Sequence, residues 1–445
     1  MALATIRLAC AAILPVIIAS PALAQDKVKL SLNGSVRVRA ETIGGQFRPN
    51  TPESDSFLSF RTMVSAKVDI GPVTFGGEVV DARGYGENER SSVRTNEIND
   101  LEPAQLYLAV RPAKGVQLTA GKFSMDIGGS RMVGRTDFPN GVPSYLGAKL
   151  EVAAKNKNAL ILFWTRPFTA LPDTPADIYD NKVQLDRATE NIEFFGGNAT
   201  LARLFGKTSL ETYGFRLIEH DRTTHPTRNR RLVTVGARLR LAPAKGNFDY
   251  EVEAALQRGL ARATAAVSDV RDLKVRAGFV HAEAGRSFAS KWAPRVSMAF
   301  DYASGETGNP DTYTRFDTLY GARRADFGPL SLYGPLGRAN ILSPAVRLEA
   351  RPSKRLDLMG SVRAAWLASA IDSFASTSVT DKTGKSGSYG GTQFELRARR
   401  WLIPQKLRFE LGAAYLAKGR FLRDAPNAPH TADTKFGHAD LSYAF

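Results

Sequence analysis

Arginines at alternate positions are the feature of this sequence best suited to chemistry. In an extended strand, side chains two residues apart point to the same side, so a pair with this spacing presents two guanidinium groups to one surface. Such groups are permanently charged and bind carboxylate or phosphate oxygens through parallel hydrogen bonds. The pattern therefore predicts a surface that binds anions. The pairs are Arg37 with Arg39, Arg238 with Arg240, and Arg397 with Arg399.

Residues with catalytic potential are fewer and poorly placed. The five histidines lack the H-E-x-x-H spacing of a zinc site. His438 and Asp440 resemble half of a catalytic triad, but no serine partner can be placed beside them. Glu251 and Glu253 could suggest glycoside hydrolysis, although arginine partners on neighbouring strands explain them more simply. An outer-membrane hydrolase is thus an alternative, while the sequence predicts no enzyme, no cofactor and no metal site.

The charge balance predicts an anionic partner. The chain of 445 residues has 60 Lys and Arg against 44 Asp and Glu, a formal net charge of +16. These basic residues are dispersed, with no basic block or helical stripe of the kind that binds nucleic acid. We therefore expect no nucleic-acid partner.

The amino terminus predicts export. Arg7 precedes an apolar run over residues 8–19, and Ala22-Leu23-Ala24 forms an A-x-A cleavage site. We interpret residues 1–24 as a cleaved secretory signal peptide and residues 25–445 as the mature chain. The single cysteine, Cys10, lies within the signal, so the mature chain has no disulfide.

Alternating polarity then recurs to the last residue and predicts an all-β fold. An even number of strands suits a closed transmembrane barrel. The eighteen predicted strands cover residues 27–40, 58–70, 73–81, 101–111, 116–125, 145–153, 158–166, 191–198, 208–218, 231–241, 248–257, 273–281, 295–303, 341–351, 355–367, 392–402, 407–417 and 435–445.

The connectors favour a barrel in the bacterial outer membrane over a soluble sheet. Short turns such as Gly71-Pro72 alternate with long polar stretches, which is typical of an up-and-down barrel with short periplasmic turns and long extracellular loops. Residues 199–207 are expected to form an unusually long turn. The last strand ends at Phe445 and is expected to close the barrel against the first strand. The stretches at 126–144 and 304–340 are the expected plugs or constrictions.

With apolar residues facing lipid, the charged residues would line a basic, water-filled bore. Arg216 and Lys274 are among the residues expected to face inward. The residues expected to form the anion pathway are Arg37, Arg39, Arg238, Arg240, Arg276, Arg397 and Arg399, with Lys122, Arg131 and Arg135 at the constriction. Some of these charges are instead expected to form cross-strand ion pairs that stiffen the wall.

Two stretches resemble the alginate export family of outer-membrane β-barrels. They are LTAGKFSMDIGGSRMVGRTDFPNGVPSYLGAKLE, at 118–151, and FDTLYGARRADFGPLSLYGPLGRANI, at 316–341. The resemblance implies an eighteen-stranded, monomeric, arginine-rich channel for an anionic polysaccharide. The family usually has Gly-Arg-Gln where this chain has Gly121-Lys122-Phe123, while Arg131, Arg135 and Gly141 keep the later positions.

The sequence thus predicts a passive outer-membrane channel that passes an acidic polysaccharide or oligosaccharide. A nutrient porin for uptake of small acids is the alternative within the same fold. The expected partners are outer-membrane lipid and anionic carbohydrate or small organic anions. A periplasmic export or uptake assembly is compatible with either function.

Overall fold

Alternating polarity produces a ring of eighteen long antiparallel strands. The computed structural model describes residues 28–223 and 225–445, so the predicted signal peptide lies outside the described residues. The barrel strands are β1 (Lys29–Gly44), β2 (Ser54–Ile70), β3 (Val73–Tyr85), β4 (Asn99–Ala113), β5 (Val116–Phe123), β6 (Tyr145–Ala153), β7 (Ala159–Thr169), β9 (Ile192–Phe205), β10 (Thr208–Glu219), β11 (Arg231–Leu241), β12 (Phe248–Ala261), β13 (Leu273–Ser287), β14 (Arg295–Ala303), β16 (Ile341–Ser353), β17 (Leu356–Trp366), β18 (Tyr389–Ile403), β19 (Leu407–Lys418) and β20 (Thr434–Ala444).

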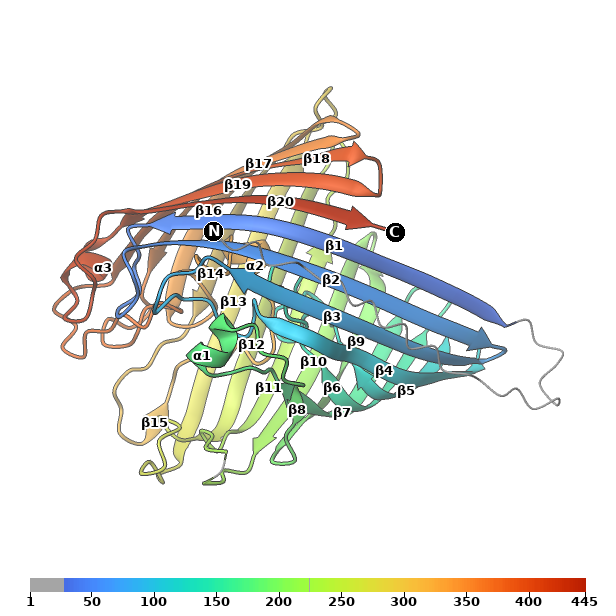
Figure 1. Cartoon of the computed structure of the whole chain (residues 1–445), viewed down its shortest axis with the longest axis horizontal. Helices are drawn as coiled ribbons and strands as arrows, with labels where there is room; N and C mark the ends of the chain where they lie inside the picture. Colours follow the sequence, from blue (N-terminus) through green and yellow to red (C-terminus); the bar gives the residue numbers. More distant parts are fainter. Residues whose placement is uncertain (1–27, 224) are drawn as a thin grey trace, which may run out of the picture.

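The ring is closed by its first and last strands, as the sequence predicted. Figure 1 shows β1, in blue, beside β20, in red. Their antiparallel register runs from Ser35 opposite Ala444 to Gly44 opposite Lys435. Gly34 and Phe445 extend it by exchanging backbone hydrogen bonds of 3.0 Å in both directions. Closure leaves no strand edge with unpaired backbone groups in the membrane.

The connectors divide the barrel into two ends. At the turn end the strands are joined by short connectors, such as residues 71–72 between β2 and β3. At the loop end the connectors are long and contain α1 (Pro175–Tyr179), α2 (Arg324–Phe327), α3 (Arg420–Asp424) and the two-residue strands β8 (Arg187–Ala188) and β15 (Thr312–Tyr313). No helix among the described residues is long and apolar enough to cross a membrane.

Strand boundaries agree closely with the alternation. Strands β6, β11 and β14 have the predicted ends, whereas most others are longer than predicted. One connector was predicted wrongly: residues 199–207 are not a long turn, because β9 continues to Phe205 and only Gly206 and Lys207 form the turn. The outward residues of the barrel are apolar and exposed, as in Leu106 (70% exposed) and Leu396 (68%).

Two long loops fold into the ring and give it an internal apolar core. Tyr320 of the connector 304–340 packs on Phe194 of β9, with ring centroids 4.9 Å apart, and on Tyr145 of β6. Phe316 of the same connector packs against Phe279 of β13. These loops therefore occupy much of the barrel interior at the loop end.

This internal core corrects the predicted direction of several charged side chains. Phe279 and Val275 of β13 point inward and are buried, so Arg276 between them points outward and is exposed. Arg216 of β10 and Lys274 of β13 also lie on the outer face. The prediction that Arg276 lines the bore is wrong because apolar side chains, not charges, face the inserted loops at this height.

Candidate functional site: the arginine-lined bore

Arginines of the first two strands clamp the connector 124–144 inside the barrel. Arg39 Nη1 donates to the Phe138 carbonyl oxygen over 2.6 Å, and the guanidinium stacks 3.9 Å above the Phe138 ring. Arg37 Nη2 donates to the same carbonyl over 3.0 Å, and Arg61 Nη1 donates to the Pro139 carbonyl over 3.2 Å. Arg37 and Arg39 are only 3% and 2% exposed. Their charges therefore hold a loop against the wall.

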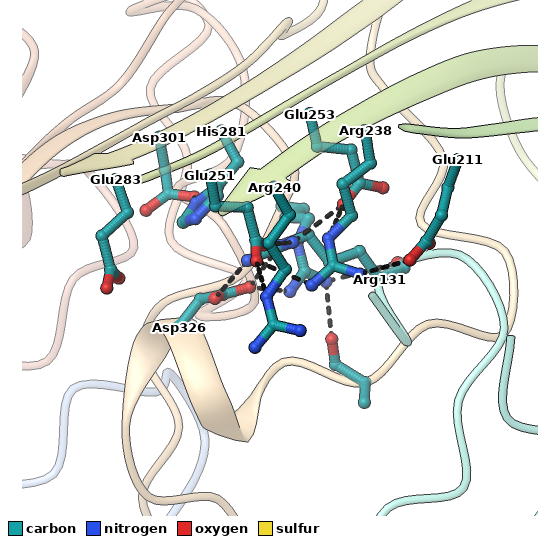
Figure 2. Close-up of polar contacts among 12 residues, drawn as sticks. Arg131, Glu211, Arg238, Arg240, Glu251, Glu253, His281, Glu283, Asp301 and Asp326 are labelled. Carbon is teal, nitrogen blue, oxygen red and sulfur yellow. Dashed lines mark hydrogen bonds and ion pairs between the residues drawn. The ribbon is translucent and has the colours of Figure 1, made fainter. Parts of the chain in front are cut away.

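A second clamp is centred on Arg131 (Figure 2). Its Nη1 lies 2.8 Å from Glu253 Oε2 and also contacts Glu251, so the loop is tied to the wall at β12. Its Nε and Nη2 each donate over 3.0 Å to the two carboxylate oxygens of Asp326 in α2. One buried arginine thus joins two inserted loops to each other and to the barrel.

Asp326 carries the negative charge at the centre of this clamp. Arg338, from the same connector as Asp326, approaches it from another side and is itself 2% exposed. Burial alone would raise the pKa of Asp326, but the guanidinium groups of Arg131 and Arg338 hold that pKa well below its ordinary value. The carboxylate remains charged, so the clamp persists across the physiological pH range.

Two cavities remain on either side of the inserted loops. The first, of about 390 Å³, is enclosed by the wall strands towards the turn end and by residues 129–138 and 322–326. The second, of about 650 Å³, lies among the loops and is lined by Arg48, Arg94 and Arg323. Thr136 borders both cavities. The segment around Thr136 is therefore the partition between the two halves of the bore.

The first cavity has an excess of positive charge. Among the described residues, nine arginines and six carboxylates line it. Among the described residues, Arg347 of β16 donates to the Ala325 carbonyl oxygen, and the one carboxylate within ion-pair distance of Arg397 of β18 is Asp357, with 4.0 Å between Arg397 Nη2 and Asp357 Oδ1. Arg408 of β19 forms no ion pair with any described residue, its guanidinium lies 6.0 Å from the Trp401 ring, and its charge helps to lower the pKa of Asp137, which lines the same cavity. These three side chains lie on β16, β18 and β19, within one stretch of four consecutive strands, and keep their charge available to a solute.

The predicted pathway residues are divided between this cavity and the clamps. Arg37, Arg39, Arg135, Arg397 and Arg399 line the first cavity. Of these, Arg399 is paired with Glu410 and Arg135 with Glu78, 2.7 Å away. Arg276 is on the outer face. The structure therefore brings together only part of the predicted set.

The other predicted basic residues lie outside both cavities and have carboxylate partners. Glu251, which also contacts Arg131, pairs with two arginines of β11: Arg238 Nη2 lies 2.6 Å from it and Arg240 Nε lies 3.2 Å from it. Lys122 is paired with Glu102 and lies 3.8 Å above the Phe168 ring. For these positions the structure favours the alternative of cross-strand ion pairs that stiffen the wall.

Sequence reasoning missed two cavity arginines, Arg324 and Arg338. Both are in the connector 304–340, where no strand periodicity assigns a direction to a side chain. The available signal was their position within the stretch 316–341 that resembles a known family. The strand alternation also directs Arg347 and Arg408 into the bore, but they were not among the residues predicted to form the anion pathway. The alternation gives the direction of a side chain and does not show whether its charge is paired with a carboxylate.

The residues with catalytic or metal-binding potential are bound by other groups. His438 Nε2 is 3.2 Å from Glu410, and Asp440 accepts from Arg39 over 3.0 Å. His281, Asp301 and Asp326 lie close enough together for one ion. However, Arg363 Nη1 donates to Asp301 over 2.7 Å, and two arginines surround Asp326. Cationic neighbours of this kind repel a metal ion.

A family model described as alginate export matches residues 28–436. This chain belongs to the alginate export family. No curated protein sequence matches this family member. Similar solved structures include OccK5 (OpdH) of Pseudomonas aeruginosa, with 10% identity, coverage of 93% of this chain and 98% of that one, and a TM-score of 0.56. OpdK of Pseudomonas aeruginosa with vanillate has 12% identity, coverage of 93% and 98%, and a TM-score of 0.58. OccAB1 of Acinetobacter baumannii has 11% identity, coverage of 93% and 96%, and a TM-score of 0.58.

Membership places this chain in the bacterial outer membrane as a channel. The similar solved structures have the same fold, and at these identities they establish the fold alone. The turn end accordingly faces the periplasm and the loop end faces the cell exterior. The family and its structural neighbours are channels, not enzymes.

Proposed function

We propose that this channel passes anionic solutes passively, with an acidic polysaccharide or oligosaccharide as its substrate class. The observation that carries the proposal is the set of three cavity arginines, Arg347, Arg397 and Arg408, that have no carboxylate of a described residue closer than 4.0 Å. Unpaired cations in a hydrated bore lower the energy of a carboxylate and raise that of a cation.

The arrangement of charge suits a polymer with repeated carboxylates. The arginines of the first cavity are spread over the wall strands β1, β16, β18 and β19 and the inserted loops. A spread of moderate sites allows stepwise movement, because binding must be weak enough for release as well as strong enough for entry. We propose that the channel works as a monomer, since the closed bore of one chain already contains both cavities.

A second candidate substrate is a small organic acid. The partition at Thr136 narrows the bore between the two cavities, and the first cavity, at about 390 Å³, has the size of a small-ligand pocket. OpdK, with a similar fold, was crystallised with vanillate, a small aromatic acid. The two candidates are distinguished by how strongly uronate oligomers and uronate monomers block the ion current through the channel. Stronger block by oligomers supports the polymer as substrate, and equal block per molecule supports the small acid.

Reversing two of the free charges should weaken anion preference. For the double variant Arg397→Glu/Arg408→Glu, we expect the chloride-to-potassium permeability ratio to fall by at least about threefold, because two cations near the path become anions. The ratio is measured from reversal potentials across planar bilayers under a salt gradient.

The matched control is Arg400→Glu, on the outer face of the same strand as Arg397. It should leave the permeability ratio unchanged. A wild-type channel without anion preference would refute the proposed function, and equal ratios for wild type and the double variant would refute the role of these two arginines. Arg238 and Arg240 were also expected to set selectivity, but their pairing with Glu251 predicts a smaller effect for Arg238→Glu/Arg240→Glu.

A further inference from the structure

The outer face of β10 to β13 carries an unexpected group of basic side chains near the loop end. We call it the outer basic row, and it consists of Arg216, Arg231, Arg258, Lys274 and Arg276. All five are exposed and alternate with buried inward residues. They interrupt an outer face on which these strands otherwise carry apolar residues at this height and below, such as Val235 and Leu256.

Strand register brings these residues side by side. Arg276 lies directly opposite Arg258, Arg258 is opposite Val233, and Val233 is opposite Arg216. One step closer to the loop end, Lys274 and Arg231 both lie opposite Leu260. Cross-strand neighbours on one face are separated by about 5 Å between their Cβ atoms. Arg258 and Arg276 are therefore adjacent, while Val233 separates Arg258 from Arg216 and Leu260 separates Lys274 from Arg231.

The row lies at the boundary between lipid tails and headgroups. Along the same register, Arg216 is opposite Phe195, and Phe195 is opposite Trp164, whose side chain is 46% exposed. Outward aromatic residues form the girdles at membrane interfaces. Arg258 and Arg276 are also within three residues of the strand ends at Ala261 and Leu273. Their guanidinium groups can therefore reach the headgroups of the outer leaflet.

The row lacks compensating negative charge within the protein. Of its five members, only Arg231 forms an ion pair with a described residue, and that partner is Asp272. Arg258 donates to the Gln257 carbonyl oxygen, while Arg258 and Arg276 are two like charges directly across a strand pair. Such a pair is destabilising without a counter-ion. In contrast, most arginines inside the barrel have carboxylate partners.

We propose that the outer basic row binds the phosphate groups of lipid A, the phosphorylated glycolipid of the outer leaflet. Phosphate oxygens between Arg258 and Arg276 would accept charge-assisted hydrogen bonds from both guanidinium groups, and the exposed apolar side chains below the row would contact the acyl chains. This site is on the lipid-facing surface and is independent of the solute that passes through the bore.

The test is native mass spectrometry of the detergent-solubilised full-length channel titrated with hexa-acylated diphosphoryl lipid A. Arg276→Glu should lower its affinity at least about tenfold, because a carboxylate then occupies the phosphate position. The same variant should unfold at an equal or higher temperature in lipid-free detergent, since the introduced carboxylate would pair with Arg258. Arg276→Lys should retain most of the binding. A loss of lipid binding together with retained stability excludes general misfolding.

Arg203→Ala is the matched control, because Arg203 is exposed on the outer face of β9 at the opposite, turn end. The affinity of this variant for diphosphoryl lipid A should equal that of the wild type. In a second comparison, the wild type should have a lower affinity for monophosphoryl lipid A than for diphosphoryl lipid A. Equal affinity of wild type and Arg276→Glu would overturn the proposal. An equal loss of lipid A affinity in Arg203→Ala would also overturn it. So would displacement of lipid A by inorganic phosphate at the same concentration as the lipid.

Discussion

Replacing Arg131 by glutamine is expected to release both inserted loops and raise single-channel conductance by at least about twofold, because the bore is constricted by protein that this residue holds. Arg131 is 7% exposed and contacts Glu251, Glu253 and Asp326. Removing one member of a buried ion network costs roughly 3–5 kcal/mol, mostly through the carboxylates left without a partner. Planar-bilayer recording measures the conductance, and heat-dependent gel migration measures barrel stability.

The double-mutant cycle of Arg131→Gln with Asp326→Asn separates this clamp from a general loss of stability. Neutralising Asp326 removes one of the charges that Arg131→Gln leaves unpaired, so the double variant should be less destabilised than the sum of the single variants. Arg420→Gln is the control, because its pair with Asp424 is exposed and worth about 0.3–0.5 kcal/mol. Unchanged conductance in Arg131→Gln would show that the loops stay in place without the clamp.

The wall of the barrel could be predicted from sequence because the membrane imposes a strict alternation. Strand β11, for example, has the predicted ends Arg231 and Leu241, and every second side chain between them is apolar. A slip of one residue would expose Arg238 and Arg240 to hydrocarbon. The free-energy cost of exposing a charged side chain to hydrocarbon applies at every second residue of a strand. A single sequence therefore contains the information needed to locate the strand and to assign its two faces.

Alternation failed where protein, not water, occupies the inside of the barrel. Phe215 and Leu217 face the inserted loops, so both sides of β10 contact apolar surroundings and Arg216 could not be assigned inward by its charge. The same condition misplaced Arg276. The error arose because a polar interior was assumed along the full height of the bore.

The clamps could not be predicted because they depend on the path of the loops. The stretch 126–144 was expected to enter the bore, and the structure confirms this. However, Arg131 meets Glu251 across 120 positions of sequence, and no periodicity links a loop residue to one strand among eighteen. Sequence therefore identified the cations, and only the structure separates those held in clamps from those available to a solute.

Excising the partition should have the largest effect on the channel. Phe123 of β5 and Tyr145 of β6 are opposite one another, so residues 125–143 can be replaced by a four-residue Gly-Ser turn without changing the strand register. The excision removes Thr136, which borders both cavities, and joins them into one bore. We expect single-channel conductance to rise by at least about threefold, because an open barrel of this strand number encloses a water-filled channel.

The same excision should increase anion preference, although it removes two arginines with the loop. Arg37, Arg39 and Arg61 lose the carbonyl oxygens of residues 137–139. Asp137 is also removed, whose pKa is lowered to about 2 against the effect of burial, chiefly by the guanidinium groups of Arg61 and Arg37. Three wall cations then face the bore.

The control replaces residues 264–269 by the same turn. These residues belong to the exposed loop between β12 and β13, where Val267 is 60% exposed. That variant should conduct as the wild type does. A partition variant with wild-type conductance would mean that the remaining loops, the connector 304–340 among them, close the bore without the partition.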